Sequence, residues 1–123
     1  MYEVLSIGEA LMDFIPVNPD AERLEAAEGG RITIPQFEEN VGGSPANVAC
    51  ALAKLGVKTG FIGKVGDDPF GRTVKGVLER SGVDIRNLIL DGAYRTPVAL
   101  VHHSPEGKRF TFYRNGQTAD THF

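Results

Sequence analysis

Short apolar runs alternate along the chain with longer segments in which apolar residues recur at helical spacing. The run at 4–7 predicts a buried parallel strand, because strands of such sheets carry apolar residues without alternation. Amphipathic helices are predicted at 44–55 and 69–81, and further strands at 59–65 and 85–90. Because strands and helices alternate, the pattern predicts βαβ crossovers and therefore an α/β fold with a parallel sheet.

The two predicted helices share the residue types at their ends. Ser44 and Asp68 are good N-caps, and the proline that follows each fits the first helical position because it has no N–H to leave unpaired. Gly56 and Gly82 follow the last helical positions, where glycine is the preferred residue. The sides expected to pack on the sheet carry Val48, Leu52 and Leu55 in the first helix and Phe70, Val74, Val77 and Leu78 in the second.

Two apolar segments towards the C-terminal end, 96–103 and 109–114, flank a proline–glycine turn and predict a β-hairpin. Both faces of the hairpin are apolar and need covering, so one could close over a ligand and the other could pack on a second subunit. Earlier in the chain, alternation at 31–37 predicts a further strand, and 18–30 is typical of a surface loop. The residues assigned to one hairpin face are Val98, Leu100, Phe110 and Phe112, and those assigned to the other are Ala99, Val101 and Tyr113.

The bulk composition is that of a single soluble globular domain. The chain has 123 residues, of which 41% are hydrophobic and 24% charged, and its net charge is −3. The absence of a basic stripe argues against a nucleic-acid partner, and no apolar run reaches the length of a membrane span. The start of the chain lacks the pattern of a signal peptide, and Cys50, the one cysteine, cannot form an internal disulfide. We therefore expect a cytoplasmic protein.

The segment 41–66 carries the clearest indication of a binding site. Gly42 and Gly43 would let a ligand approach the backbone closely, and the helix that follows offers unpaired N–H groups and a partial positive charge at its start. Asn47 falls near the third helical position, on the turn whose amides are expected to be free. Together these features predict a site for an oxygen-rich ligand, and they leave a phosphate, a carboxylate and a polyol open.

Several acidic residues and histidines are possible ligand-binding groups. Asp13 follows the first strand, and ligands of open α/β sheets gather at the carboxyl ends of strands, so it is a candidate ligand-binding residue; the alternative is that it caps a turn. Asp67 and Asp68 begin the second helix, a position more typical of caps than of metal ligands. We expect no metal site. Metal-site spacing is likewise absent from the histidines, which are His102, His103 and His122.

Seven residues at fixed spacing form one motif: Gly42, Gly43, Pro45, Asn47, Ala49, Gly56 and Gly66. Three further motifs flank it in order, GEALMDF at 8–14, GKVGDDPFG at 63–71 and FYRNGQTAD at 112–120. Together they resemble the N-terminal signature of the ribokinase-like (PfkB) carbohydrate kinases, over nearly the whole chain. The flanking motifs look most like the fructokinase branch, although the last departs from its commonest forms at Gly116 and Gln117.

This resemblance implies the N-terminal part of a ribokinase-like fold. Its core βαβ units would be formed by about 1–12 and 42–92, and a small β-sheet lid by about 13–37 and 96–114. In that family the lid covers the sugar and often makes the dimer contact. The resemblance therefore implies a homodimer that forms through the lid strands.

The resemblance also implies a reaction, transfer of the ATP γ-phosphoryl group to a sugar hydroxymethyl oxygen, with ATP and Mg²⁺ as cofactors. Asp13 would accept hydrogen bonds from sugar hydroxyls, and Phe112 would pack on the apolar face of the sugar. Arg114 resembles a lid arginine that contacts substrate; the alternative is a solvated or salt-bridged arginine at a strand end. The residues implied to bind the sugar are Asp13, Gly42, Gly43, Asn47, Phe112 and Arg114.

In that family the nucleotide site and the catalytic base lie in a C-terminal part, around a GAGD-type motif that this sequence lacks. We therefore expect the chain to carry no catalytic or cofactor-binding residues of the reaction and to be inactive alone. The substrate could instead be ribose, 2-keto-3-deoxygluconate or a nucleoside. Other open alternatives are a non-catalytic dimerisation or regulatory module and a nucleotide-binding oxidoreductase domain, against which the missing GxGxxG motif counts.

Overall fold

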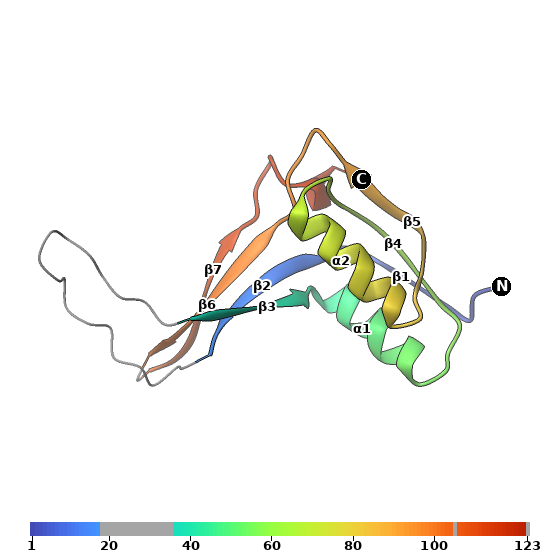
Figure 1. Ribbon diagram of the computed structural model, residues 1–123, viewed down its shortest axis with the longest axis horizontal. Coiled ribbons are helices and arrows are strands. Elements are labelled where there is room, and N and C mark those ends of the chain that lie inside the picture. Colours follow the sequence, from blue (N-terminus) through green and yellow to red (C-terminus); the bar gives the residue numbers. More distant parts are fainter. Residues whose placement is uncertain (18–35, 105, 123) are drawn as a thin grey trace, which may run out of the picture.

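Two sheets and two α-helices make up the part of the chain that the computed structural model describes, residues 1–17, 36–104 and 106–122 (Figure 1). One sheet has three strands in the order β1-β4-β5, and the other has four in the order β3-β2-β6-β7. The described elements, in chain order, are β1 (Val4–Ile7), β2 (Leu11–Pro16), β3 (Phe37–Gly42), α1 (Ser44–Lys54), β4 (Thr59–Gly66), α2 (Pro69–Arg80), β5 (Asp84–Asp91), β6 (Val98–Ser104), β7 (Gly107–Tyr113) and the short 3-10 helix η1 (Ala119–Thr121).

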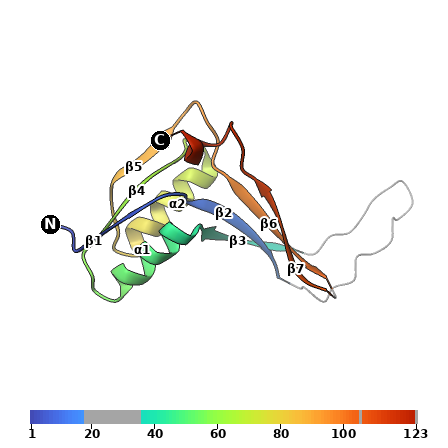
Figure 2. The same ribbon diagram turned by 180° about the vertical axis from the view of Figure 1, so that it is seen from behind.

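The three-stranded sheet is parallel throughout and confirms the α/β prediction, because β4 pairs in parallel with both β1 and β5. Its core lies on the side of α1 and α2 (Figure 2), where Phe61 and Val65 of β4 meet Val74 and Leu78 of α2, all fully buried. After β1 the chain runs through β2 and β3 of the other sheet, and it then returns to the three-stranded sheet through α1. Strands β2 and β3 of the second sheet are thus inserted into the first crossover, and its other two strands, β6 and β7, follow β5.

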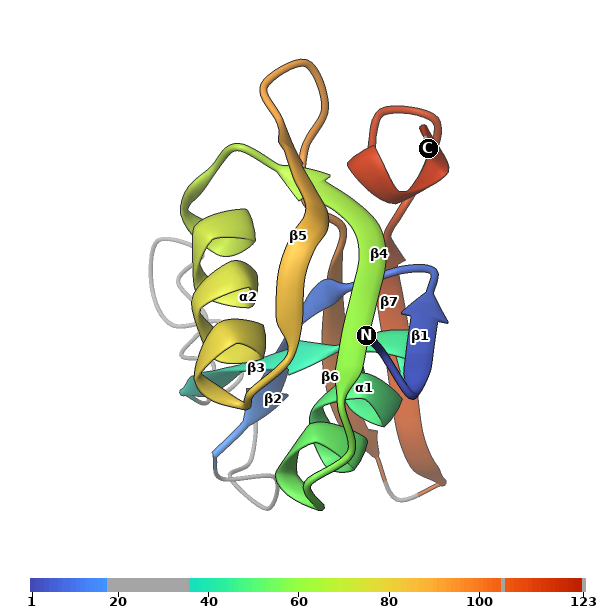
Figure 3. The same cartoon turned by 90° about the vertical axis from the view of Figure 1, so that its right-hand side faces the viewer.

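The opposite face of the three-stranded sheet carries exposed apolar side chains. Leu5 and Ile7 of β1 are 51% and 64% exposed, and Ile89 of β5 is 54% exposed. No helix lies in front of these strands in Figure 3, where β4 passes in front of α1. The prediction of a buried first strand was therefore wrong for these side chains, although the strand and its parallel pairing are present. Parallel sheets normally have both faces covered.

The four-stranded sheet contains the predicted hairpin and one strand that the sequence did not reveal. Strands β6 and β7 pair in antiparallel register, with Ala99 opposite Phe112, and β2 joins the hairpin by parallel pairing with β6. Strand β3 pairs with β2 along Phe37–Gly42. Most of the strand predicted at 31–37, together with the loop predicted at 18–30, lies outside the described residues.

The helix α1 differs from the prediction at its start and in the face that it buries. Its N-cap is Gly43, with φ of 95°, and Ser44 is the first helical residue and makes no capping bond. The face predicted to pack on the sheet is open, since Val48 is 51% and Leu55 80% exposed. The helix instead contacts the core through alanines, above all Ala46 and Ala49, whose small side chains let it lie close to the sheet.

The helix α2 is as predicted. Asp68 caps it by accepting the Gly71 N–H (2.8 Å), and Pro69 is its first residue. Gly56 and Gly82 follow the two helices with φ of 88° and 95°, which confirms both predicted ends. Neither described helix is long and apolar enough to cross a membrane.

Candidate functional site

The carboxylate of Asp13 lies over the backbone of Gly42. Strand β2 pairs with β3 so that Leu11 stands opposite Gly42, and a β-carbon at position 42 would lie 2.6 Å from the Cγ of Asp13. Asp13 is half-buried, and it makes no hydrogen bond or ion pair with any described residue. Its burial raises the pKa of this carboxyl above the ordinary value. A half-buried carboxylate without a partner is a candidate for ligand binding.

The strand register places Asp13 and Phe112 on one face of the four-stranded sheet. Asp13 stands opposite Asn40 on one side and Ala99 on the other, and Ala99 stands opposite Phe112. Directly paired residues point to the same face of a sheet, so these four side chains form a row across it. The ring of Phe112 is exposed and stacks on Phe110, with 5.8 Å between ring centroids. The row presents a carboxylate and an aromatic surface together.

This register corrects the predicted faces of the hairpin. Phe110 and Phe112 share their face with Ala99 and Val101, which are buried, and not with Val98 and Leu100 as predicted. The other face carries Val98, Leu100 and Tyr113. A shift of one residue in strand pairing exchanges the two faces, and the sequence does not specify which register the turn imposes.

Gly43 allows the backbone to turn from β3 into α1. A side chain there would have to adopt a positive φ, and its β-carbon would lie 2.7 Å from the carbonyl oxygen of Glu9. The first turn of α1 follows, and the Asn47 N–H donates to the Gly43 carbonyl (2.9 Å). The amide of Asn47 is therefore not free, contrary to the prediction. The N–H groups without an intrahelical acceptor are those of Ser44 and Ala46, and the Asn47 side chain is exposed.

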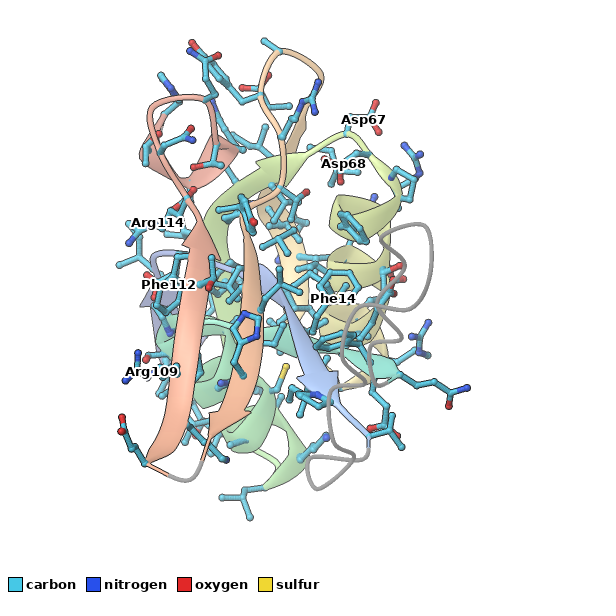
Figure 4. The ribbon with its side chains drawn as sticks, turned by 90° about the vertical axis from the view of Figure 1, so that its left-hand side faces the viewer. Phe14, Asp67, Asp68, Arg109, Phe112 and Arg114 are labelled. Atoms are coloured by element: carbon cyan, nitrogen blue, oxygen red, sulfur yellow. The ribbon has the colours of Figure 1, made fainter. Side chains whose placement is uncertain are left out.

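Arg114 follows β7 and pairs with Asp120. Its Nε donates to the Oδ2 of Asp120, and this bond raises the pKa of the guanidinium. In Figure 4, Arg114 and Phe112 lie beside β7 on the side away from α2, whereas Phe14 lies towards α2. The salt-bridged alternative for Arg114 is therefore present, but the bond uses one of its three nitrogens and the side chain is 46% exposed. Asp120 was not singled out from the sequence, although it ends the FYRNGQTAD motif.

A separate hollow of about 700 Å³ lies on the other face of the four-stranded sheet, beside the start of α2. None of the six predicted sugar-binding residues lines it. Phe14 and Phe70 form part of its wall and meet edge to face, with 5.5 Å between centroids. Its remaining lining residues are Asp68, Pro69, Arg95, Thr96, Val98, Leu100, Tyr113, Asn115, Gln117 and Thr118.

Neither described helix start is suited to the phosphates of ATP. The start of α2 is occupied by Asp68, whose carboxylate accepts from Gly71 and from both the backbone and the hydroxyl of Thr96. The start of α1 lies next to Gly42 and hence to Asp13, whose charge would repel a phosphate. Within the described ranges, no three His, Cys, Asp or Glu residues are grouped so that they could hold a metal ion.

Comparison with known proteins gives matches along the whole chain. Residues 1–123 match the family model described as the pfkB family carbohydrate kinase. Fructokinase-1 from Oryza sativa subsp. japonica is 42% identical over 113 residues, which cover 91% of this chain and 32% of that protein. The chain thus spans about a third of the length of this relative.

Solved structures of fructokinases also match the chain. The crystal structure of fructokinase from Xylella fastidiosa matches with a TM-score of 0.81 and 30% identity, over 100% of this chain and 35% of that one. A double mutant of fructokinase from Vibrio cholerae O395, solved with fructose, ADP and potassium ion bound, matches with a TM-score of 0.73 and 32% identity, over 95% of this chain and 33% of that one.

Proposed function

Because this chain belongs to the pfkB family of carbohydrate kinases, we propose that it is the sugar-binding part of a fructokinase-like enzyme. The complete enzyme would transfer the ATP γ-phosphoryl group to a hydroxymethyl oxygen of a ketose such as fructose. The chain spans about a third of its relatives, so ATP, Mg²⁺ and the catalytic base would be held by polypeptide outside the 123 residues. ATP supplies the phosphoryl group, and the residues of this chain bind, orient and cover the sugar.

Asp13 is the residue that carries this proposal. Its half-buried carboxylate has no partner among the described residues, and the glycine beneath it leaves room for the carboxylate. A carboxylate accepts hydrogen bonds from hydroxyls and repels phosphates and other carboxylates. Of the three ligand classes that the sequence left open, the polyol therefore fits best.

The neighbours of Asp13 support the same ligand class. Phe112 offers an aromatic surface on the same face, which suits the apolar C–H face of a sugar ring. The N–H groups at the start of α1 follow Gly42 and Gly43 directly and could donate to further hydroxyl oxygens. Asn47 extends from this first turn, and Arg114 lies on the same side as Phe112. Positioning of this kind is the main demand that phosphoryl transfer makes on a protein.

A dimerisation module is the second candidate, favoured by the exposure of the outer strand. Every residue of β7 is exposed, and the strand forms an edge of its sheet. Such an edge can pair with a second copy of the chain. The proposed homodimer through the lid strands is compatible with sugar binding, because β7 has one face towards Asp13 and another face available for contact.

Titration with D-fructose tests the proposed function. The purified chain should bind D-fructose in calorimetry, and Asp13→Asn should weaken this binding by about tenfold or more, as expected for the loss of a charged hydrogen-bond partner. Asp67→Asn is a matched control, because Asp67 forms an exposed ion pair with Arg72 and lies beside the start of α2, away from Phe112 (Figure 4). Failure of the folded wild-type chain to bind fructose, combined with dimerisation in sedimentation velocity, would favour the module.

A further inference from the structure

Asp120 is a carboxylate held out of solvent in the short helix η1, which follows the β6–β7 hairpin. Its side chain is 0% exposed, and its only described partner is the Nε of Arg114. The second oxygen, Oδ1, is buried and makes no hydrogen bond within the described part of the chain. A buried carboxylate is unfavourable unless a positive charge compensates it. Arg114 is that compensating charge, so the two residues act as a unit.

The loop that carries Asp120 is tied down on both sides. The Asn115 N–H donates to the Thr118 hydroxyl oxygen (3.2 Å), and this hydroxyl donates back to the Asn115 carbonyl (2.7 Å). The Ala119 N–H donates to the Arg95 carbonyl (2.8 Å), which fixes the loop to the segment before β6. The carboxylate of Asp120 is therefore a fixed point relative to the end of β7.

The ion pair leaves most of the guanidinium free. Because Asp120 is bonded through Nε, both terminal nitrogens of Arg114, with four N–H donors, have no partner among the described residues. The charge of Glu9 also raises the pKa of Arg114, so the guanidinium lies within the electrostatic reach of Glu9. The backbone carbonyl of Glu9 is in turn the close neighbour of Gly43. Arg114 lies on the same side of β7 as Phe112 (Figure 4), and Phe112 shares its sheet face with Asp13, so the free donors belong to the side of the sheet that carries Asp13.

We propose that Asp120 is a positioning residue, which holds Arg114 by its Nε so that the two terminal nitrogens face the oxygens of the sugar bound over Asp13. This inference rests on the proposed function. The geometry requires arginine, because its planar group can bond Asp120 at one edge and a ligand at another. Lysine carries its three N–H donors on one nitrogen, so it cannot bond Asp120 at one edge and present a separate, fixed pair of nitrogens to the ligand. Asp120 itself does not touch the sugar.

The test uses D-fructose titration of four forms of the chain: wild type, Asp120→Asn, Arg114→Lys and the double variant. Each single change should weaken fructose binding by about tenfold, the effect of losing one well-oriented charged hydrogen bond. The double variant should bind no more weakly than either single variant, because both changes disable the same guanidinium. Asp67→Asn, which breaks an exposed aspartate–arginine pair, should change affinity by less than about twofold.

The outcomes separate the two proposals. If the folded wild-type chain binds no fructose, the proposed function fails and this inference falls with it. If wild type binds and Asp120→Asn binds equally well, only the positioning role of Asp120 is overturned. Additive losses in the double variant would also overturn it, since they indicate that Asp120 acts through general stability.

A measurement on the wild-type chain covers the case in which Asp120→Asn does not fold. In nitrogen-labelled protein, fructose should shift the terminal N–H signals of Arg114 and leave its Nε–H signal, already engaged by Asp120, nearly unchanged. Terminal signals that do not respond while fructose binds would overturn the inference.

Discussion

Replacement of Gly42 by alanine is the sharpest test of the site, because it alters one atom beneath Asp13. The new β-carbon would lie 2.6 Å from the Cγ and 2.9 Å from the Oδ1 of Asp13, so the carboxylate must rotate away. Since Asp13 is bonded to no described residue, it can move at little cost. We expect a loss of about 1 kcal/mol in unfolding free energy, the low end of the range for overpacking, which corresponds to about 4 °C in Tm.

The effect of Gly42→Ala on ligand binding should be larger than its effect on stability. Displacement of the Asp13 carboxylate removes a charged hydrogen-bond acceptor, which is equivalent to about 1.5–3 kcal/mol, or about 10- to 150-fold in the Kd for D-fructose. Urea denaturation measures the first quantity and calorimetric titration the second. In an Asp13→Asn background, where the acceptor is already impaired, Gly42→Ala should weaken binding little further.

Gly43→Ala should lower the free energy of unfolding more than Gly42→Ala does. Here the β-carbon would lie 2.7 Å from a backbone oxygen, that of Glu9, at a residue with φ of 95°. The backbone cannot rotate away as a side chain can, so we expect a larger loss of stability, about 3 kcal/mol from strain and overpacking together.

If Gly42→Ala folds and binds fructose as the wild type does, the assignment of Asp13 and Gly42 to the sugar site is wrong.

Three further predictions concern the helix cap, the uncovered sheet and catalysis. Asp68→Ala should lower the unfolding free energy in urea by about 2–4 kcal/mol, because it removes a cap and the bonds to Thr96. Burial alone would raise the pKa of Asp68, but the hydrogen bonds from Thr96 and Gly71 together lower it, so this contribution is present above pH 3.8 and is lost as the pH falls through the lowered pKa; a variant with unchanged acid sensitivity would contradict it. Ile7→Lys with Ile89→Lys should reduce self-association of the chain in sedimentation velocity with a stability change within about 0.5 kcal/mol, since both side chains are exposed; undiminished association would show that this face is not responsible. The purified chain should show no ATP-dependent phosphorylation of D-fructose above background in a coupled assay, and clear turnover would place the base within these residues.

The crossovers and helix ends could be predicted from the sequence because their signals are local. Proline after Asp68 and glycine at 56 and 82 specify the start and stop of helices whatever surrounds them. The family resemblance likewise rests on contiguous motifs, and it led to Asp13 and Phe112, which the register then places on one face of a sheet.

The remaining features depend on partners that a sequence does not display. Strand β3 has polar, exposed residues at Glu38, Glu39 and Asn40 and lacks an alternating pattern, so only its pairing with β2 reveals it. The faces of the hairpin depend on a one-residue choice of register. The role of Asp120 depends on its burial, which comes from the fold around the loop and not from its neighbours in the chain.

The four-stranded sheet joins segments that are far apart in the sequence, since Met12 of β2 pairs directly with Val98 of β6. During synthesis, β2 and β3 leave the ribosome long before the strand that completes their sheet exists. Pairing between such distant segments is slow because a long loop must close first. We therefore expect the β4–α2–β5 unit to form early and the four-stranded sheet to be completed last, when β6 pairs with β2 and β7 then pairs with β6.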